Sequence, residues 1–484
     1  MAAYEPVIGL EVHVQLATES KLFCGCPAAF GALPNSQTCP VCLGLPGVLP
    51  VLNQRAFEWG IKVALAFDCE LADTMKFDRK QYYYPDLPKN YQISQYDQPL
   101  SRAGHLDITV ESHAKRIGIT RVHMEEDAGK LLHDPQQPSS YVDFNRAGVP
   151  LLEIVSEPDL RSPEEAYQYL VELKSVLRYL DVSTCNMEEG SLRCDANLSL
   201  RPAGRAAFGS KVEIKNLNSF KFVKAALEFE HARQARELDG GRRIAQETRL
   251  WNAKAKATEL MRSKEEASDY RYFPEPDLVP FRIERGVVER VTRELPELPA
   301  QRRARYAAQY GLSVYDARVL TQHRRIAEVF EQAVSLYAKP KPVANWMMGD
   351  LLAYCNAKGK EPDEVTIQPV WLVHLLEAIE AGTISGTMAK ELFVEVIERQ
   401  QDPQQIITAR HLTQIVDDGQ LAPLADAVIA EHPKSVQDYR KGKPNALMFL
   451  IGQCMRRSQG KANPTQVTEI LKRKLQQQGQ EVSG

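Results

Sequence analysis

The sequence predicts an α+β protein whose first part is built around an antiparallel sheet and whose second part is entirely helical. Up to about residue 290, short segments with an apolar residue at every second position are separated by turn residues, and two helical segments interrupt them. Beyond this point the apolar residues recur at helical spacing throughout. The 484 residues, 44% hydrophobic and 25% charged, are enough for two to four domains.

The first predicted strand, residues 7–16, has an apolar face and a polar face. Its alternation places Glu11, His13 and Gln15 together on the polar face. Further strands are predicted at residues 106–111, 117–126, 141–145, 151–157, 192–201 and 211–217. One polar-faced strand is usually just a solvated surface, so Glu11 and His13 need partners on other strands before they indicate a site.

Two helices are predicted within this sheet region, at residues 162–179 and 219–238. The first begins Ser-Pro-Glu-Glu, an N-cap followed by proline at the first helical position and by acids near the positive end of the helix dipole. The prolines of ELPELP, residues 294–299, cannot continue a ladder or a helix interior. We therefore predict three domains, residues 1–293, 294–405 and 406–484, the last division following an Asp-Pro turn.

Four cysteines follow the first predicted strand as two close pairs, Cys24 with Cys26 and Cys39 with Cys42. Four thiolates so placed can surround one tetrahedral zinc ion and leave no coordination position open, so we predict a structural zinc site. A reduced, metal-free knuckle is the alternative. Because no apolar signal segment or Arg-rich presequence precedes the first strand, we expect a cytoplasmic, reducing location, which disfavours disulfides.

The net charge of −3 hides a strongly basic C-terminal region. Residues 434–474 contain ten Lys or Arg against two acids, an excess of eight positive charges. This excess predicts a polyanionic partner. No apolar run of about 18 residues occurs, so we expect no membrane-spanning segment.

Acids gather with Lys and Arg on the predicted polar faces. Residues 125–127 read Glu-Glu-Asp, Glu153 lies on another strand, and Arg193, Asp195 and Lys215 share the polar faces of two more. Carboxylates suit magnesium, and Lys and Arg suit phosphate. A solvated, salt-bridged face is the alternative.

The loop at residues 79–95 interleaves Lys80 and Lys89 with four tyrosines and two prolines. Cations beside aromatic rings suit a nucleotide or the 3′ end of an RNA, whereas a tyrosine-rich loop packed on the domain edge is the alternative. No P-loop, dinucleotide fingerprint or nucleophile elbow occurs in the sequence. If ATP is used, we expect it on an open sheet face.

Several longer strings together resemble one known family. They include VIGLEVHVQL, YYYPDLPKNYQISQYDQPL, HMEEDAGK, NRAGVPLLEIVSEPDLRSPEEA, MEEGSLRCDANLSLRP, DYRYFPEPDL and LIGQCMRRSQGKANP. The family is the B subunit of the tRNA-dependent amidotransferase, and the resemblance runs from Val7 to Leu475. Asn90 stands where the family usually has Gly, and the large insertion of the archaeal paralogue is absent, which favours the bacterial three-subunit type.

The resemblance implies a cradle domain like that of glutamine synthetase, a helical linker domain and a small tail domain that binds tRNA. It implies that ATP phosphorylates the side-chain carboxylate of Asp-tRNA(Asn) or Glu-tRNA(Gln), and that ammonia from an amidase (A) subunit displaces the phosphate. The expected cofactors are ATP, Mg²⁺ and Zn²⁺. The expected partners are that amidase subunit, a small C subunit, tRNA(Asn) or tRNA(Gln) carrying Asp or Glu, and a non-discriminating aminoacyl-tRNA synthetase.

The resemblance also groups the candidate residues into one predicted site. Magnesium would be held by Glu11, His13, Glu126 and Glu153. Lys80 and Lys89 would reach the phosphates, and Asp195 and Lys215 would complete the catalytic set. Tyr82, Tyr84, Lys89 and Arg193 are the residues expected to bind the nucleotide.

Two other classes of function stay open from the residues alone. A self-contained ligase acting on a small acid would need no RNA, which the basic C-terminal region disfavours. A zinc-stabilised RNA-binding scaffold would need no acids on its sheet face.

Overall fold

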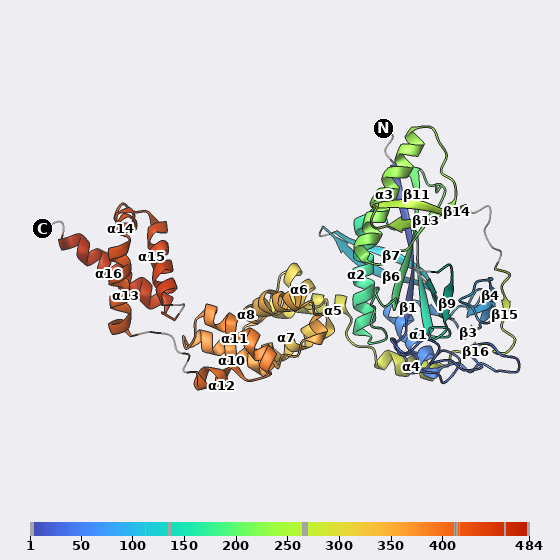
Figure 1. Ribbon diagram of the computed structural model, residues 1–484, viewed down its shortest axis with the longest axis horizontal. Coiled ribbons are helices and arrows are strands. Elements are labelled where there is room, and N and C mark those ends of the chain that lie inside the picture. The colour runs from blue at the N-terminus through green and yellow to red at the C-terminus, as the bar shows by residue number, and fades with distance from the viewer. Residues whose placement is uncertain are drawn as a thin grey trace. The chain divides into compact units, whose positions relative to one another are not determined.

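The chain folds into two compact units, Met1–Leu298 and Pro299–Gly484. The computed structural model describes residues 4–111, 113–133, 137–263, 270–410, 412, 415, 417–458 and 461–481 (Figure 1). The boundary between the units lies close to the predicted one between residues 293 and 294. The second unit has two separate apolar cores, one within Tyr306–Ile407 and one within Leu421–Leu475, so the second predicted boundary, at 405, falls just inside the end of the first core. The three-domain division itself stays a prediction.

A nine-stranded sheet organises the first unit, in the order β14-β13-β12-β11-β1-β10-β7-β6-β2. All neighbours are antiparallel except β12 and β13, which are parallel. The strands are β1 (Tyr4–Gln15), β2 (Glu70–Leu71), β6 (Ser101–Val110), β7 (His113–Glu126), β10 (Pro150–Ser156), β11 (Leu192–Pro202), β12 (Val212–Lys215), β13 (Glu247–Asn252) and β14 (Ala257–Ser263). The expected large, mainly antiparallel sheet is thus confirmed, with β1 lying between β10 and β11.

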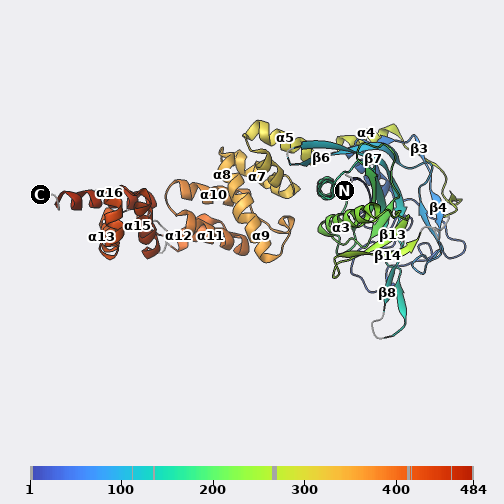
Figure 2. The same cartoon turned by 90° about the horizontal axis from the view of Figure 1, so that it is seen from above.

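Smaller sheets surround this one. They are formed by β3 (Thr74–Met75) with β16 (Phe281–Arg282), by β4 (Asp78–Gln81) with β5 (Tyr91–Ser94) and β15 (Phe273–Pro274), and by β8 (Lys130–His133) with β9 (Ser140–Asp143). Figure 2 shows the β8 and β9 hairpin projecting from the body of the first unit. The sequence prediction included β9 as residues 141–145 but not the other strands of these small sheets.

The described residues of this unit form four helices: α1 (Gln54–Ala66), α2 (Pro163–Tyr179), α3 (Phe220–Asp239) and α4 (Arg285–Arg293). Ser162 and Ser219 cap α2 and α3, their hydroxyls accepting from the backbone N–H of Glu165 and Phe222, which confirms both predicted helix starts. Helices α2 and α3 pack on each other and on the sheet (Figure 1). They bury the apolar side chains of β1, among them Leu10 and Val12, in one core.

An irregularity in β7 changes which side chains face this core. Opposite β10, Val155 pairs with Arg121 but Ser156 pairs with Ile119, so one extra residue is inserted in β7. Before the bulge Ile117 and Ile119 lie in the core, and after it Val122 and Met124 do. The bulge therefore shifts the alternation of β7 by one residue before the strand reaches its acids.

The second unit is helical. Its helices are α5 (Pro299–Tyr310), α6 (Val314–Leu320), α7 (Arg324–Leu336), α8 (Pro340–Trp346), a π-helical turn (Met347–Leu351), α9 (Leu352–Lys358), a 3₁₀ turn (Pro362–Glu364), α10 (Pro369–Glu380), α11 (Gly386–Arg399), α12 (Pro403–Ala409), α13 (Asp418–Glu431), α14 (Pro433–Arg440), α15 (Pro444–Arg457) and α16 (Pro464–Glu481). Among the described residues, no helix is long and apolar enough to cross a membrane.

Candidate functional site

The register of β1 with its two neighbours gathers the polar side chains predicted on separate strands. His13 is paired with Glu153 of β10 and with Arg193 of β11, and Glu11 is paired with Asp195. Beyond β10, Glu125 of β7 is paired with Leu151, two residues from Glu153. Since alternate residues share a face, these side chains lie on the face of the sheet opposite the core.

Three of these side chains form a group that could hold a divalent cation. The Nε2 atom of His13 lies 3.4 Å from a carboxylate oxygen of Glu125 and 3.6 Å from one of Glu153. One potential ligand atom from each residue lies within 4.8 Å of the others. His123, also on this face, places its Nε2 atom 3.3 Å from Glu153. Two carboxylates and an imidazole are a donor set that fits a hard or borderline divalent ion.

The acids in this group are buried, and their neighbours keep them charged. Burial raises the pKa of Glu153, but the charge of His123 and hydrogen bonds from both histidines outweigh it, so its pKa lies well below the usual range. Burial lowers the pKa of His123, yet the charge of Glu153 and a hydrogen bond to Glu125 raise it to about 9. The group is therefore a compact set of charges away from bulk water, which strengthens each interaction.

A cavity of about 570 Å³ opens over this part of the sheet face. The predicted site residues that line it are His13, Lys80, Tyr82, Tyr84, Arg193, Asp195 and Lys215, joined by Glu125, Asp127, Arg146 and Tyr270. Most of the predicted catalytic and nucleotide-binding residues are thus brought together in one cavity. The individual roles predicted for them stay predictions.

Cations on the rim of the cavity are positioned by acids. Lys215 donates to Asp195 at 2.5 Å and lies 3.1 Å from Glu213. Arg193 donates to the buried carboxylate of Asp127 at 2.8 Å, and Arg146 reaches the same carboxylate at 3.5 Å. Lys80 lies 5.1 Å from the ring centroid of Tyr270. An anion entering the cavity would meet fixed guanidinium and ammonium groups.

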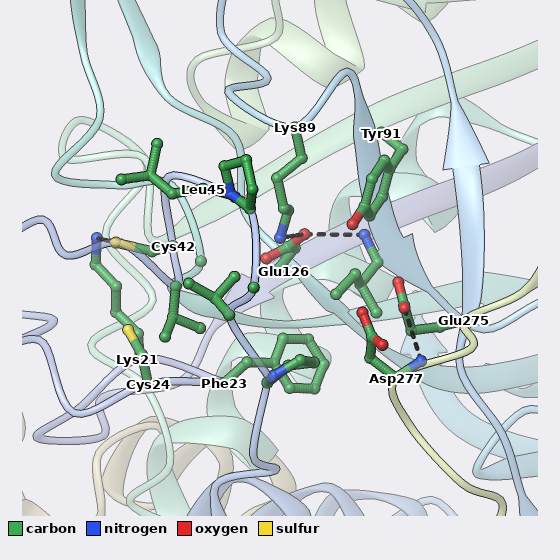
Figure 3. Close-up of a pocket in the computed structure, with 18 residues that line it drawn as sticks. Lys21, Phe23, Cys24, Cys42, Leu45, Lys89, Tyr91, Glu126, Glu275 and Asp277 are labelled. Atoms are coloured by element: carbon green, nitrogen blue, oxygen red, sulfur yellow. Dashed lines mark hydrogen bonds and ion pairs between the residues drawn. The ribbon is translucent and has the colours of Figure 1, made fainter.

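Glu126 and Lys89 lie apart from the other residues of the predicted set, and the roles predicted for them stay predictions. Glu126 points to the other face of the sheet, where it forms an ion pair with Lys89 and accepts from the backbone N–H of Ile93 at 3.0 Å. Both residues line a separate cavity of about 220 Å³, shown in Figure 3. The structure therefore brings Glu125, not Glu126, to His13 and Glu153, and it keeps Lys89 out of the cavity that holds Lys80.

Glu11 is placed on the predicted face but outside the ion-binding group. Its carboxylate accepts from the side-chain amide of Asn197 at 2.9 Å. The described group of potential ligands contains His13, Glu125 and Glu153, without Glu11. Glu11 thus lies beside this group on β1, two residues before His13 and on the same face.

The sequence contained a signal for which acid of β7 lies on the face of His13. The apolar positions of β7 change from odd numbers, Ile117 and Ile119, to even numbers, Val122 and Met124. Such a change of phase indicates a bulge, after which Glu126 must share the face of Met124. The sequence prediction took Glu126 from the family resemblance and not from the alternation of residues 117–126. It also missed His123, Arg146 and Tyr270, the first of which follows from the same phase change.

The four cysteines predicted to bind zinc converge in the loop after β1. Their sulfur atoms all lie within 4.8 Å of one another, and those of Cys39 and Cys42 are 3.9 Å apart. Four sulfurs at zinc-ligand distance around one ion would be spaced by about 3.8 Å. A hydrogen bond from Cys24 lowers the pKa of Cys42 to about 4, aided by the backbone N–H of Cys39 and the charge of Lys21. The residues present therefore fit a tetrathiolate zinc site.

We predict that the group of His13, Glu125 and Glu153 binds divalent cations. With Mn²⁺ as a paramagnetic probe, Glu125→Gln should weaken binding by at least about tenfold, because one of two carboxylate ligands loses its charge. Glu157→Gln is the control, since Glu157 accepts from Thr120 at 2.7 Å and lies outside the group. Equal Mn²⁺ affinity of wild type and Glu125→Gln would contradict the assignment.

Comparison with known proteins places this site within a family. Residues 6–289 match the model described as the GatB/GatE catalytic domain, and residues 328–475 match the model described as the GatB domain. The chain is 55% identical over 478 residues to a Carboxydothermus hydrogenoformans protein named as the B subunit of aspartyl/glutamyl-tRNA(Asn/Gln) amidotransferase, covering 98% of this chain and 99% of that protein. Proteins of the same name from Caldanaerobacter subterraneus and Moorella thermoacetica are each 54% identical, covering 98% of this chain and 99% and 100% of theirs. The chain therefore belongs to the family of aspartyl/glutamyl-tRNA(Asn/Gln) amidotransferase B subunits.

Proposed function

We propose that this chain carries out the ATP-dependent amidation of misacylated Asp-tRNA(Asn), Glu-tRNA(Gln) or both. The observation that supports it is the meeting of His13, Glu125 and Glu153 with Lys80, Arg193 and Lys215 over one sheet face. The relatives over nearly the full length are named for the same activity. We propose that the sheet that carries this face corresponds to the glutamine-synthetase-like cradle that the sequence resemblance implies.

The arrangement suits a reaction in which a carboxylate becomes an acyl phosphate. A carboxylate is a poor electrophile, so its oxygen must first take the γ-phosphoryl group of ATP, and phosphate then leaves when ammonia attacks the acyl carbon. Both reactants are anions, and bringing them together requires neutralisation. A magnesium ion held by His13, Glu125 and Glu153 would neutralise phosphate charge when bound.

The remaining side chains of the cavity would bind and orient the two anions. Lys80 and Arg193 lie where they can contact phosphate oxygens, and Asp127 fixes the guanidinium of Arg193. Tyr82 and Tyr84 offer aromatic faces for a base, either of ATP or of the tRNA 3′ end. Asp195, at the rim and in contact with Lys215, can accept a proton from the attacking ammonia.

Ammonia would come from a partner subunit. The relatives are named as the B subunit of their enzyme, which implies further subunits. No nucleophile motif of a glutaminase occurs in this sequence. We propose an amidase subunit as the ammonia source and a small third subunit alongside it, with a non-discriminating aminoacyl-tRNA synthetase supplying the misacylated tRNA.

The proposed function predicts that ADP forms only when misacylated tRNA is present. With the assembled complex, labelled ATP and no ammonia source, Glu125→Gln should lower phosphate transfer by about two to four orders of magnitude, because transition-state charge loses its counter-ion. Glutamine hydrolysis by the partner should persist in this variant. ATP turnover with a free small acid but no tRNA would indicate a self-contained ligase, and no ATP turnover at all would indicate an RNA-binding scaffold.

We further propose that Cys24, Cys26, Cys39 and Cys42 hold one structural zinc ion. Metal analysis of the purified chain should give about one zinc per chain, because four thiolates close the coordination shell. Removing the metal with a strong chelator should lower the melting temperature and leave four thiols free to react. A preparation without zinc and with undiminished stability would contradict this proposal.

The basic region at residues 434–474 is proposed to contact the tRNA backbone. Its cations fall into two classes, those paired with acids and those that are not. Lys443 and Arg473 form ion pairs with Asp438 and Asp418. Among the described residues, Lys461 and Lys472 have no such carboxylate partner, which leaves their charge available for phosphate.

Replacing both Lys461 and Lys472 with Ala should therefore weaken tRNA binding and reduce its salt dependence. Each lost phosphate contact lowers the slope of log affinity against log salt by about one, so the slope should fall by about two. The paired control, Lys443→Ala with Arg473→Ala, should change the slope less. Turnover at saturating tRNA should survive in both. An unchanged slope in the first variant would make this region a fold or partner-docking module.

A further inference from the structure

Lys21 is a fully buried lysine beside the cysteine group. Its side chain is 0% exposed, and its Nζ atom contacts the sulfur of Cys42 at 3.6 Å and donates to the backbone carbonyl of Phe144 at 3.3 Å. Figure 3 shows the ammonium of Lys21 directed at Cys42. A buried ammonium is costly unless an anion and hydrogen-bond acceptors surround it.

The sulfur of Cys42 is the anion that the structure offers to Lys21. Within the described part of the chain, no carboxylate forms an ion pair with Lys21, although Glu126 lines the same cavity and is paired with Lys89 instead. Gly148 packs against both side chains: a Cβ atom there would make ordinary contacts, 3.5 Å from Lys21 Cδ and 3.4 Å from Cys42 Cβ, and its φ of +84° favours glycine. The backbone at position 148 thus contacts both Lys21 and Cys42.

Charge balance explains why a lysine would contact the cysteine group. Four thiolates around Zn²⁺ carry a net charge of about −2, which is unfavourable in a partly buried loop. One buried ammonium hydrogen-bonded to a sulfur halves this charge.

We propose that Lys21 is a positioning residue of the cysteine metal site, stabilising the metal-bound thiolate of Cys42 by charge and hydrogen bonding. This inference rests on the proposed zinc site. Lys21 also connects the cysteine loop to the cavity over the sheet face. Its ammonium donates to the carbonyl of Phe144, and the backbone N–H of Leu22 donates to the carbonyl of Gly148 at 2.8 Å. Arg146 lies between Phe144 and Gly148 in the sequence, donates to the carbonyls of Ala128 and Gly129, and lines that cavity.

The test is the zinc affinity of full-length variants, measured by competition with a chromophoric chelator at fixed pH. Lys21→Met should weaken zinc binding by about 10- to 100-fold, the usual effect of losing a group that orients or charge-balances a ligand. Lys21→Arg, which keeps the charge, should recover most of the affinity. Lys62→Met is the matched control, because Lys62 also donates to a backbone carbonyl, that of Leu180 at 2.8 Å, on a different part of the unit.

The outcomes separate this inference from the zinc proposal. Wild type that binds no zinc would overturn both. Wild type that binds zinc, with Lys21→Met of equal affinity, would overturn the role of Lys21 alone, even if its melting temperature falls as it does for Lys62→Met. If Lys21→Met does not fold, Lys21→Gln takes its place, with the same expected loss of affinity.

Discussion

The candidate site depends on the two-residue alternation of β1, which separates an apolar face from a charged one. Leu10 and Val12 fill the core beneath α2 and α3, whereas His13 and Glu11 lie on the opposite face. A slip of β1 by a single residue against β10 would bury His13 and expose the core, so burial of the apolar face fixes the register. That same register brings His13 to Glu153 and Arg193.

The charged face is stable because its charges compensate one another. Glu125, Asp127 and Glu153 are buried, and each contacts a histidine or an arginine. Burial raises the pKa of Asp127 and Glu153, but the adjacent cations lower it by more, so that both pKa values lie below their usual range. A bound cation would meet carboxylates that are already in place, and a bound phosphate would meet guanidinium and ammonium groups that are already in place. In this way a sheet face without a P-loop can bind a nucleotide.

Alternation and capping let the sequence predict much of this arrangement, but its three-dimensional details depend on contacts between distant residues. Ser162 and Ser219 marked the helix starts, and Arg193, Asp195 and Lys215 were placed on the correct face from their own strands. Strand order is a tertiary property, so the meeting of Glu153 with His13 needed the family resemblance. The choice between Glu125 and Glu126 depended on the bulge in β7, which reverses the direction of both side chains.

The loop residues were the least predictable from sequence. Lys80 and Lys89 belong to one tyrosine-rich segment, yet they line different cavities: Lys80, in β4, lines the cavity of His13, whereas Lys89, in the turn before β5, lines the cavity of Glu126. Nothing in local spacing indicates that difference. In the same way, Lys21 gave no signal until the fold buried it against Cys42.

The central claim is that a side-chain carboxylate of the substrate is phosphorylated over this sheet face. It is tested most directly with Asp-tRNA(Asn) carrying ¹⁸O in that carboxylate, incubated with the assembled complex, ATP and ammonia. Because the carboxylate oxygen attacks the γ-phosphorus and leaves with it, one ¹⁸O should appear in the inorganic phosphate for each amide formed. Phosphate without ¹⁸O, or ¹⁸O in AMP, would contradict the account.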